Sequence, residues 1–263
     1  MEILQTSETS DTQSRRTFIS KALAAGVLTA GSFWIPQTAE PVRGEIRAVL
    51  FDGFALFDPR PVFILTEEIF PGKGKEITDL WRNRQLEYCW LTQAAQQYRN
   101  FTEITQDALL FATKKAGIIL SDSDRDKLMN AYQNMDSWGD VSTTLRFLKT
   151  KGCIAGILSN MTMTMLYENI SRNGLTEFIG PVISTDQIKS YKPSPQSYQM
   201  GPDTLQLKKS EILFVASAGW DAAGASWFGY PTFWVNRQNA PVEELNENVS
   251  GGNYKLEAML HLL

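Results

Sequence analysis

The chain has 263 residues, 43% of them apolar and 21% charged, which is enough to form one large hydrophobic core, or one core with a smaller inserted domain. Its formal net charge of −4 provides no basic face for phosphates, which excludes nucleic acid as an expected partner. The single histidine, His261, stands close to the C-terminus, so catalysis that needs a placed imidazole is excluded, and the chemistry must use carboxylates, Lys and Arg.

The N-terminus has the features of an export signal. Ser-Arg-Arg-Thr-Phe-Ile-Ser-Lys at residues 14–21 precedes an apolar run at 22–34. A charged flank before a modest apolar stretch is what a twin-arginine export receptor reads, and the stretch is too short to span a bilayer comfortably. We therefore assign residues 1–43 to a signal and linker, and expect a periplasmic or extracytoplasmic protein, cleaved or anchored at its N-terminus, with the export machinery as a partner. The alternative is an accidental basic pair in a disordered tail.

From residue 44 onward, apolar runs alternate with helical patterns. Ala-Val-Leu-Phe-Asp at 48–52 is typical of a buried parallel strand that delivers a carboxylate to its carboxyl end. Similar runs predict strands at residues 153–160, 181–184, 212–217 and 232–236. Helical patterns separate them at residues 140–151, 162–173, 197–207 and 221–228. This alternation predicts an α/β, doubly wound parallel sheet, in which ligands bind at the carboxyl ends of the strands.

Residues 59–138 show no strand signal, but long helical patterns occupy 74–98, 103–117 and 121–133. A helical cap inserted after the first strand accounts for them, and the α/β core then consists of residues 44–58 and 139–263. Cys89 and Cys153 lack the spacing of a metal or redox pair, so we expect buried structural thiols. The apolar surface of the cap helices makes a homodimer a reasonable expectation.

The order of these elements, together with the residues at their ends, resembles the haloacid dehalogenase (HAD) superfamily. A strand ending in Asp is followed by the helical cap, a strand ending in Ser-Asn, a Tyr-Lys-Pro turn and a strand leading into Ser-x-x-Trp-Asp. In the cap, Leu-Trp-Arg-Asn-Arg-Gln-Leu-Glu-Tyr at 80–88 is similar to the type II (S)-2-haloacid dehalogenases, as are 70–77 and 98–101. The resemblance runs from Arg47 to the C-terminus. It implies a Rossmann-like core with an inserted cap, and hydrolysis of short (S)-2-haloacids to 2-hydroxyacids through an aspartyl ester, with no metal or organic cofactor.

The resemblance also implies four catalytic residues. Asp52 matches the nucleophile that displaces halide, with a helix-capping Asp as the alternative, whereas Asp58 matches a residue leading into the cap. Lys192 matches the lysine that pairs with the nucleophile and keeps it ionised, rather than a solvated lysine before a proline turn. Asp221 matches the acid that positions the hydrolytic water. Arg82 matches the cap arginine that draws off the halide, with a surface arginine as the alternative.

Six further residues match the substrate pocket of the family, and they are Leu86, Phe101, Ser159, Asn160, Tyr198 and Trp220. The Ser-Asn pair would hydrogen-bond the substrate carboxylate and the departing halide, or would only form a turn at a strand end. The tyrosine matches an active-site tyrosine, and the other three match an apolar wall. Ordinary core packing is the alternative for these four residues.

Three departures from the family pattern bear on activity. The first motif reads Asp-Gly-Phe-Ala-Leu-Phe-Asp at 52–58, one residue shorter than the family's Asp-x-Tyr-Gly-Thr-Leu-Phe-Asp and without its Thr. The family's Ser-Ser-Asn-x-Trp-Asp becomes Ala-Ser-Ala-Gly-Trp-Asp, so Ala216 and Ala218 lose polar groups that would help orient the hydrolytic apparatus. Gly201-Pro202 interrupts a predicted helix, where proline costs about 3 kcal/mol in a regular interior. Together these changes point to drift, new specificity or lost activity.

Two other functions remain open. A catalytically impaired, exported binding protein would keep the pocket and the cap, and the departures favour it. A phosphatase of the same superfamily would need Mg²⁺ held by an Asp-x-Asp pair and further acids. Here Phe54 stands two residues after Asp52, and Asp221 is the one acid of the later loop, so magnesium has too few oxygen ligands. Dehalogenation is the favoured function.

Overall fold

The computed structural model describes residues 45–245 and 249–263. The expected export signal at residues 1–43 lies outside these described residues. All described residues belong to one compact unit, Arg43–Leu263. In this part of the chain, no helix is both long and apolar enough to cross a membrane.

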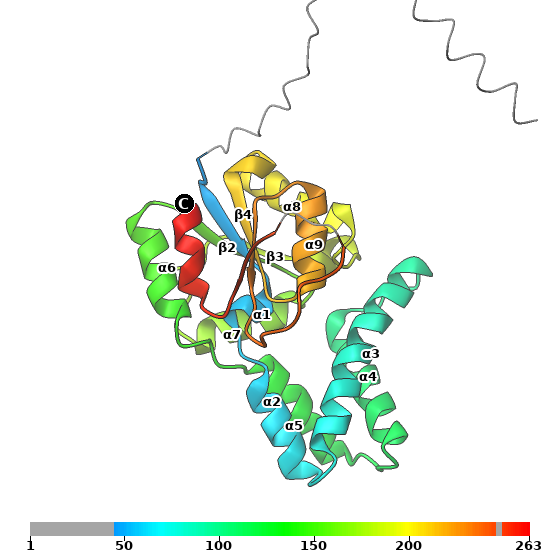
Figure 1. Ribbon diagram of the computed structural model, residues 1–263. Helices are drawn as coiled ribbons and strands as arrows, with labels where there is room; N and C mark the ends of the chain where they lie inside the picture. The colour runs from blue at the N-terminus through cyan, green and yellow to red at the C-terminus, as the bar shows by residue number, and fades with distance from the viewer. Residues whose placement is uncertain (1–44, 246–248) are drawn as a thin grey trace, which may run out of the picture. The chain divides into compact units, whose positions relative to one another are not determined.

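A six-stranded sheet forms the centre of the fold (Figure 1). Its strands, in spatial order, are β3 (Val182–Ser184), β2 (Ile154–Ser159), β1 (Ala48–Phe51), β4 (Ile212–Ala216), β5 (Thr232–Val235) and β6 (Ser250–Asn253). Each neighbouring pair is parallel, which confirms the predicted doubly wound α/β core. β6 was not predicted, because its sequence, Ser-Gly-Gly-Asn, contains no apolar run.

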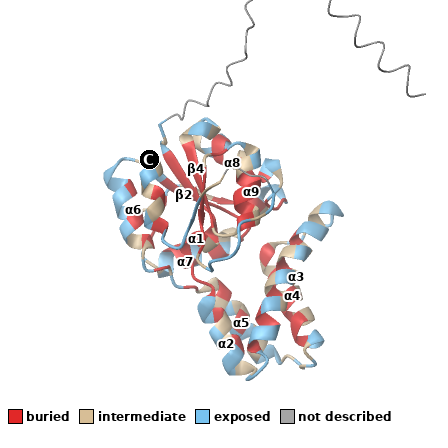
Figure 2. Ribbon diagram, in the orientation of Figure 1, coloured by how far each residue is buried: buried red, intermediate tan, exposed pale blue. Residues whose placement is uncertain are grey.

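Helices cover both faces of the sheet, and the central strands are buried (Figure 2). They are α6 (Val141–Thr150), α7 (Met163–Arg172), α8 (Pro195–Leu205) and α9 (Gly219–Phe228), each within two residues of its predicted bounds. Val49 and Phe51 of β1 pack in the cluster that contains α6, α7 and the C-terminal 3₁₀ helix η3 (Leu256–Leu262), whereas Ala48 and Leu50 pack with α8 and α9. This alternation is the period of two that a strand buried on both faces must have.

The cap consists of four helices between β1 and α6: α2 (Arg60–Ile69), α3 (Gly74–Ala94), α4 (Phe101–Lys115) and α5 (Asp122–Gln133). α3 packs against α4 and α2, and α5 also contacts α2 (Figure 1). α2 was not predicted, and α3 ends before the predicted residue 98 because the chain turns at Gln96, which has φ of +56°.

As expected, Cys89 is buried, while Cys153 is only half-buried. The homodimer stays a prediction.

The structure explains how α8 tolerates Pro202. Proline has no N–H, so Pro202 cannot donate the helical hydrogen bond to the carbonyl of Tyr198, four residues earlier. Instead the hydroxyl of Tyr230 donates to the Tyr198 carbonyl oxygen at 2.7 Å. α8 therefore continues to Leu205 with Pro202 buried inside it. The predicted helix is thus present despite Pro202, because a tertiary hydrogen bond replaces the missing local one.

We expect Tyr230→Phe to lower the free energy of unfolding by about 1–3 kcal/mol, because it leaves the buried Tyr198 carbonyl without a donor. Urea denaturation would measure the change, with Tyr167→Phe at an exposed position of α7 as the control. Adding Pro202→Ala restores a backbone donor, so the loss should be smaller in the double variant than in Tyr230→Phe. Equal stability of Tyr230→Phe and the wild type would contradict this role.

Candidate active site

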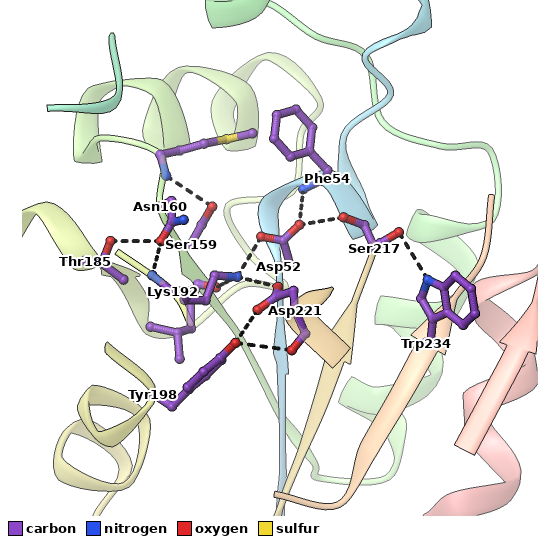
Figure 3. Close-up of polar contacts among 12 residues, drawn as sticks. Asp52, Phe54, Ser159, Asn160, Thr185, Lys192, Tyr198, Ser217, Asp221 and Trp234 are labelled. Carbon is purple, nitrogen blue, oxygen red and sulfur yellow. Dashed lines mark hydrogen bonds and ion pairs between the residues drawn. The ribbon is translucent and has the colours of Figure 1, made fainter. Parts of the chain in front are cut away.

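Six of the predicted site residues, Asp52, Ser159, Asn160, Lys192, Tyr198 and Asp221, gather at the carboxyl ends of three neighbouring strands (Figure 3). Asp52 follows β1, Ser159 ends β2 with Asn160 directly after it, and Asp221 lies in the first turn of α9, after β4. Lys192 comes from the segment between η1 (Thr185–Ile188) and α8. Because all strands are parallel, their carboxyl ends meet at one edge, which is where open α/β sheets bind ligands.

Lys192 is the centre of the site. Its side chain is fully buried, and Nζ donates to Asp52 Oδ1 at 2.8 Å, Asp221 Oδ2 at 2.7 Å and the Leu158 carbonyl oxygen at 3.2 Å. Burial alone would lower the pKa of Lys192, but the adjacent carboxylates of Asp221 and Asp52 raise it. The ammonium therefore stays charged and uses all three of its N–H donors.

Asp221 lies across the Lys192 ammonium from Asp52, and the Tyr198 hydroxyl holds it in place. The Tyr198 hydroxyl donates to Asp221 Oδ1 at 2.7 Å. Burial raises the pKa of Asp221 to about 6, the Lys192 ammonium opposes this rise, and the charge of Asp52 adds to it. Burial and the charge of Asp221 raise the pKa of Tyr198 well above its usual value, which keeps it a hydrogen-bond donor. Tyr198 is thus both a packed core residue and a contact of Asp221.

Asp52 receives two further donors at its other oxygen. Oδ2 accepts from Phe54 N at 3.1 Å and from Ser217 Oγ at 2.8 Å, so the carboxylate also caps the short helix α1 (Gly53–Leu56). Asp58, in contrast, is paired with Arg60. Ser217 was not predicted as a site residue, although the serine of Ser-x-x-Trp-Asp was the available signal. Three different donors orient the Asp52 carboxylate.

Hydrogen bonds hold Ser159 and Asn160 in the site, in one case to a nearby residue and in the other to residues far along the chain. Asn160 Oδ1 accepts from Lys192 N at 2.9 Å and from Thr185 Oγ1 at 3.2 Å, which fixes the amide and leaves Nδ2 as the group able to donate to a ligand. Ser159 Oγ accepts from the backbone N–H of Met161. A Cβ at Gly53 would lie 2.9 Å from Met161 Sδ and 3.0 Å from Ser159 Oγ, so a larger residue there would displace the Met161 side chain, which lines the pocket.

A pocket of about 30 Å³ lies over Asp52. Its walls are formed by Asp52, Phe54, Arg82, Leu86, Phe101, Ser159, Asn160, Met161, Ser217, Ala218, Trp220 and Asp221. Eight of the ten predicted site residues are among them, and the other two, Lys192 and Tyr198, lie in hydrogen-bond contact beneath. Phe54 and Met161, like Ser217, line the pocket but were not predicted as site residues. The structure thus brings all ten predicted residues together.

Arg82 supplies positive charge from the cap. Its guanidinium lies 4.7 Å from the centre of the Phe54 ring, and Nη1 is buried and makes no hydrogen bond of normal geometry among the described residues. The buried Tyr132 hydroxyl is its neighbour: burial raises the pKa of Tyr132, and the charge of Arg82 opposes this rise. The alternative of a solvent-exposed arginine does not apply, since the residue is half-buried. A buried donor without a partner is costly, so an anion in the pocket would be stabilised there.

The cap also touches the segment that carries Lys192. Trp90 Nε1 donates to the Lys192 carbonyl oxygen at 3.3 Å, and Tyr191 N donates to Gln93 Oε1 at 3.0 Å. The Tyr191 hydroxyl donates to the Arg99 carbonyl oxygen at 2.6 Å. These contacts tie the end of α3 and the start of α4 to the backbone on either side of the buried ammonium.

The two alanines of the fourth motif occupy different environments. Ala216 is fully buried in the same apolar cluster as Tyr198 and does not line the pocket. Ala218 lines the pocket and is the N-cap of α9, where it makes no side-chain hydrogen bond. Of the two lost polar groups, only the one at Ala218 therefore borders the site directly.

Comparison with known proteins agrees with this geometry. Residues 83–235 match the family model described as haloacid dehalogenase-like hydrolase. An (S)-2-haloacid dehalogenase of Pseudomonas sp. strain YL is 37% identical over 82% of this chain and 94% of its own length. A solved L-2-haloacid dehalogenase has 34% identity and a TM-score of 0.81, covering 83% of this chain and 98% of its own. The L-2-haloacid dehalogenase of Xanthobacter autotrophicus, solved with chloropropionic acid covalently bound, has 34% identity and a TM-score of 0.69 over 76% of this chain and 80% of its own.

We expect Lys192→Met to lower the free energy of unfolding by about 3–5 kcal/mol, because it leaves two carboxylates buried without a counter-charge. Adding Asp221→Asn should recover part of this loss. Urea denaturation would measure both variants, with Lys151→Met at an exposed position as the control. A Lys192→Met protein as stable as the control would show that the ammonium does not hold the two acids together.

Proposed function

Because the chain belongs to the haloacid dehalogenase-like hydrolase family, we propose that it hydrolyses short (S)-2-haloacids to 2-hydroxyacids through an ester on Asp52. The observation that carries the proposal is the oriented Asp52 carboxylate beneath a pocket whose other wall bears the Arg82 guanidinium. The related enzyme that holds chloropropionic acid covalently supports a covalent route.

In the first step, a carboxylate oxygen of Asp52 attacks C2 of the substrate from the side opposite the halogen. The new C–O bond forms as the carbon–halogen bond breaks, the electron pair leaves with the halide, and the configuration at C2 inverts. Negative charge develops on the halogen, and the unpaired Nη1 of Arg82 is the donor placed to stabilise it. The substrate carboxylate would be held by Ser159 Oγ and Asn160 Nδ2.

In the second step, water attacks the carbonyl carbon of the Asp52 ester. Asp221 accepts the proton of that water, and its pKa of about 6 suits a base at neutral pH. The donors Lys192 Nζ, Ser217 Oγ and Phe54 N, which already bind the Asp52 oxygens, would stabilise the tetrahedral intermediate. The intermediate collapses as the bond between the Asp52 carbonyl carbon and the ester oxygen breaks, and that oxygen takes the proton held by Asp221, which frees the 2-hydroxyacid. The oxygen of the water stays on Asp52, whose carboxyl group loses the remaining proton, so haloacid and water give hydroxyacid, halide and a proton.

The proposed reaction needs no metal ion, because the donor set does not suit one. Lys192 Nζ lies between Asp52 and Asp221, where it provides the positive charge that a divalent cation would otherwise supply. Phe54, rather than an acid, stands two residues after Asp52. Among the described residues, no group of three or more His, Cys, Asp or Glu side chains could hold a metal. A magnesium-dependent phosphatase is therefore disfavoured.

We expect the purified protein to release halide from (S)-2-chloropropionate but not from the R-form, and to do so equally well in EDTA. Asp52→Asn should lower this release by at least about a thousandfold, because the nucleophile is lost. Ion chromatography of free chloride measures the rate. If halide release fails, mass spectrometry for an ester adduct on Asp52 distinguishes slow hydrolysis from an impaired binding protein, which would form no adduct.

The twin-arginine sequence supports an extracytoplasmic location for this activity. Residues 14–21 carry the arginine pair directly before the apolar run. We expect the double variant Arg15→Lys, Arg16→Lys to stay in the cytoplasm, since the receptor reads the pair rather than the charge. Cell fractionation measures this, with Lys21→Arg as the control. Export of the double variant at the wild-type level would refute the assignment.

A further inference from the structure

A groove of about 490 Å³ adjoins the small pocket over Asp52. The two cavities share six lining residues, which are Phe54, Arg82, Leu86, Ser217, Ala218 and Trp220. Beyond them, side chains of α2 and α3 line the groove on one side and residues 236–243 line it on the other. The groove is therefore continuous with the site and lies between the cap and the core.

The sizes of the two cavities differ in a way that bears on the substrate. Since about 10–15 Å³ is enough for one water, the inner pocket of about 30 Å³ has room for two or three atoms of that size, such as a halogen or the oxygens of a carboxylate. The groove falls within the range of about 300–1,000 Å³ that is usual for small-molecule sites. The reacting end of a substrate fits the pocket, and anything longer must extend into the groove.

We propose that this protein prefers 2-haloacids with an uncharged apolar chain of several carbons at C2, and that this chain lies in the groove and enters it past Ala218. This inference rests on the proposed function, and it names the substrate class of the same site. Ala218 is then the residue that sets the chain length.

Ala218 has the position and the size that this role requires. It lines both cavities, and its side chain ends at Cβ, whereas the family pattern has the longer Asn there. Alanine is a poor N-cap, and Ala218 makes no capping hydrogen bond to α9. The presence of alanine at position 218 is therefore not explained by the stability of α9. It is explained by the small side chain, which leaves a passage open between the pocket and the groove.

The walls of the passage suit an apolar chain. Phe54, Leu86 and Trp220 are partly exposed there, and Phe54 stands where the family pattern has a Tyr hydroxyl. Farther along, the groove carries charged groups: Arg237 pairs with Asp140 at 2.7 Å and Asp79 pairs with Lys75, whereas Glu243 makes no ion pair among the described residues. Burial of a methylene group strengthens binding roughly fourfold, so three added methylenes could raise affinity by more than about tenfold.

The test compares (S)-2-bromohexanoate with (S)-2-bromopropionate, which share the leaving group. We expect the wild-type kcat/KM to be at least about tenfold higher for the longer acid, because burial of its three additional methylene groups strengthens binding. Ala218→Leu, which fills the passage, should lower the ratio of the two kcat/KM values by about tenfold or more. Ala95→Leu, the same change at an exposed position of the cap, should leave this ratio unchanged.

A wild-type ratio of one or less, or a ratio unaffected by Ala218→Leu, would overturn the inference. No halide release from either acid would contradict the proposed function instead. In that case calorimetry with hexanoate and propionate, which carry no halogen, tests the groove by itself. Tighter binding of hexanoate that is lost in Ala218→Leu supports the groove as a binding site, and equal binding of the two acids overturns it.

Discussion

One buried ammonium group holds the catalytic end of this fold together. Lys192 lies between Asp52 and Asp221, and without it two buried acids would face each other with no counter-charge. Several parts of the chain converge to place it: Asn160 binds its backbone N–H, Leu158 accepts from its Nζ, and the cap contacts its carbonyl oxygen. Stability and chemistry therefore depend on the same interaction, because the ammonium that offsets the two acids also orients the nucleophile.

The cap completes a site that the sheet alone leaves open. It brings Arg82 over Phe54 and adds Leu86 and Phe101 to the pocket wall. The cap also hydrogen-bonds to Tyr191 and Lys192, and Lys192 in turn donates to Asp52. The cap wall and the nucleophile are therefore connected through the same short stretch of chain. A halide leaving C2 of the substrate, on the side opposite Asp52, would thus meet a positive charge supplied by a different part of the chain from the charge that orients the nucleophile.

The departures from the family pattern have unequal consequences. Pro202 is accommodated by the hydroxyl of Tyr230, and Ala216 lies within an apolar cluster, so neither disturbs the polar network around Asp52. The shortened first motif still lets Phe54 N and Ser217 Oγ bind the Asp52 carboxylate. Ala218 is different, because it borders both the pocket and the groove. These observations favour altered specificity over lost activity.

The sequence by itself predicted the parallel sheet except β6, the helices α6 to α9 that cover it, and, through the resemblance to a known family, ten residues that the structure brings to one site. Apolar periodicity reports burial along one element, and parallel strands bring their carboxyl ends to one edge, so residues at strand ends could be grouped without coordinates. Weak local patterns left α2 and β6 unrecognised. Only the tertiary structure decided that Ser217 contacts Asp52, that Tyr230 replaces the hydrogen bond missing at Pro202, and that a groove opens past Ala218. Such features depend on packing between distant positions, as with Asp52 and Lys192, which lie 140 positions apart in the chain, and no local pattern encodes that packing.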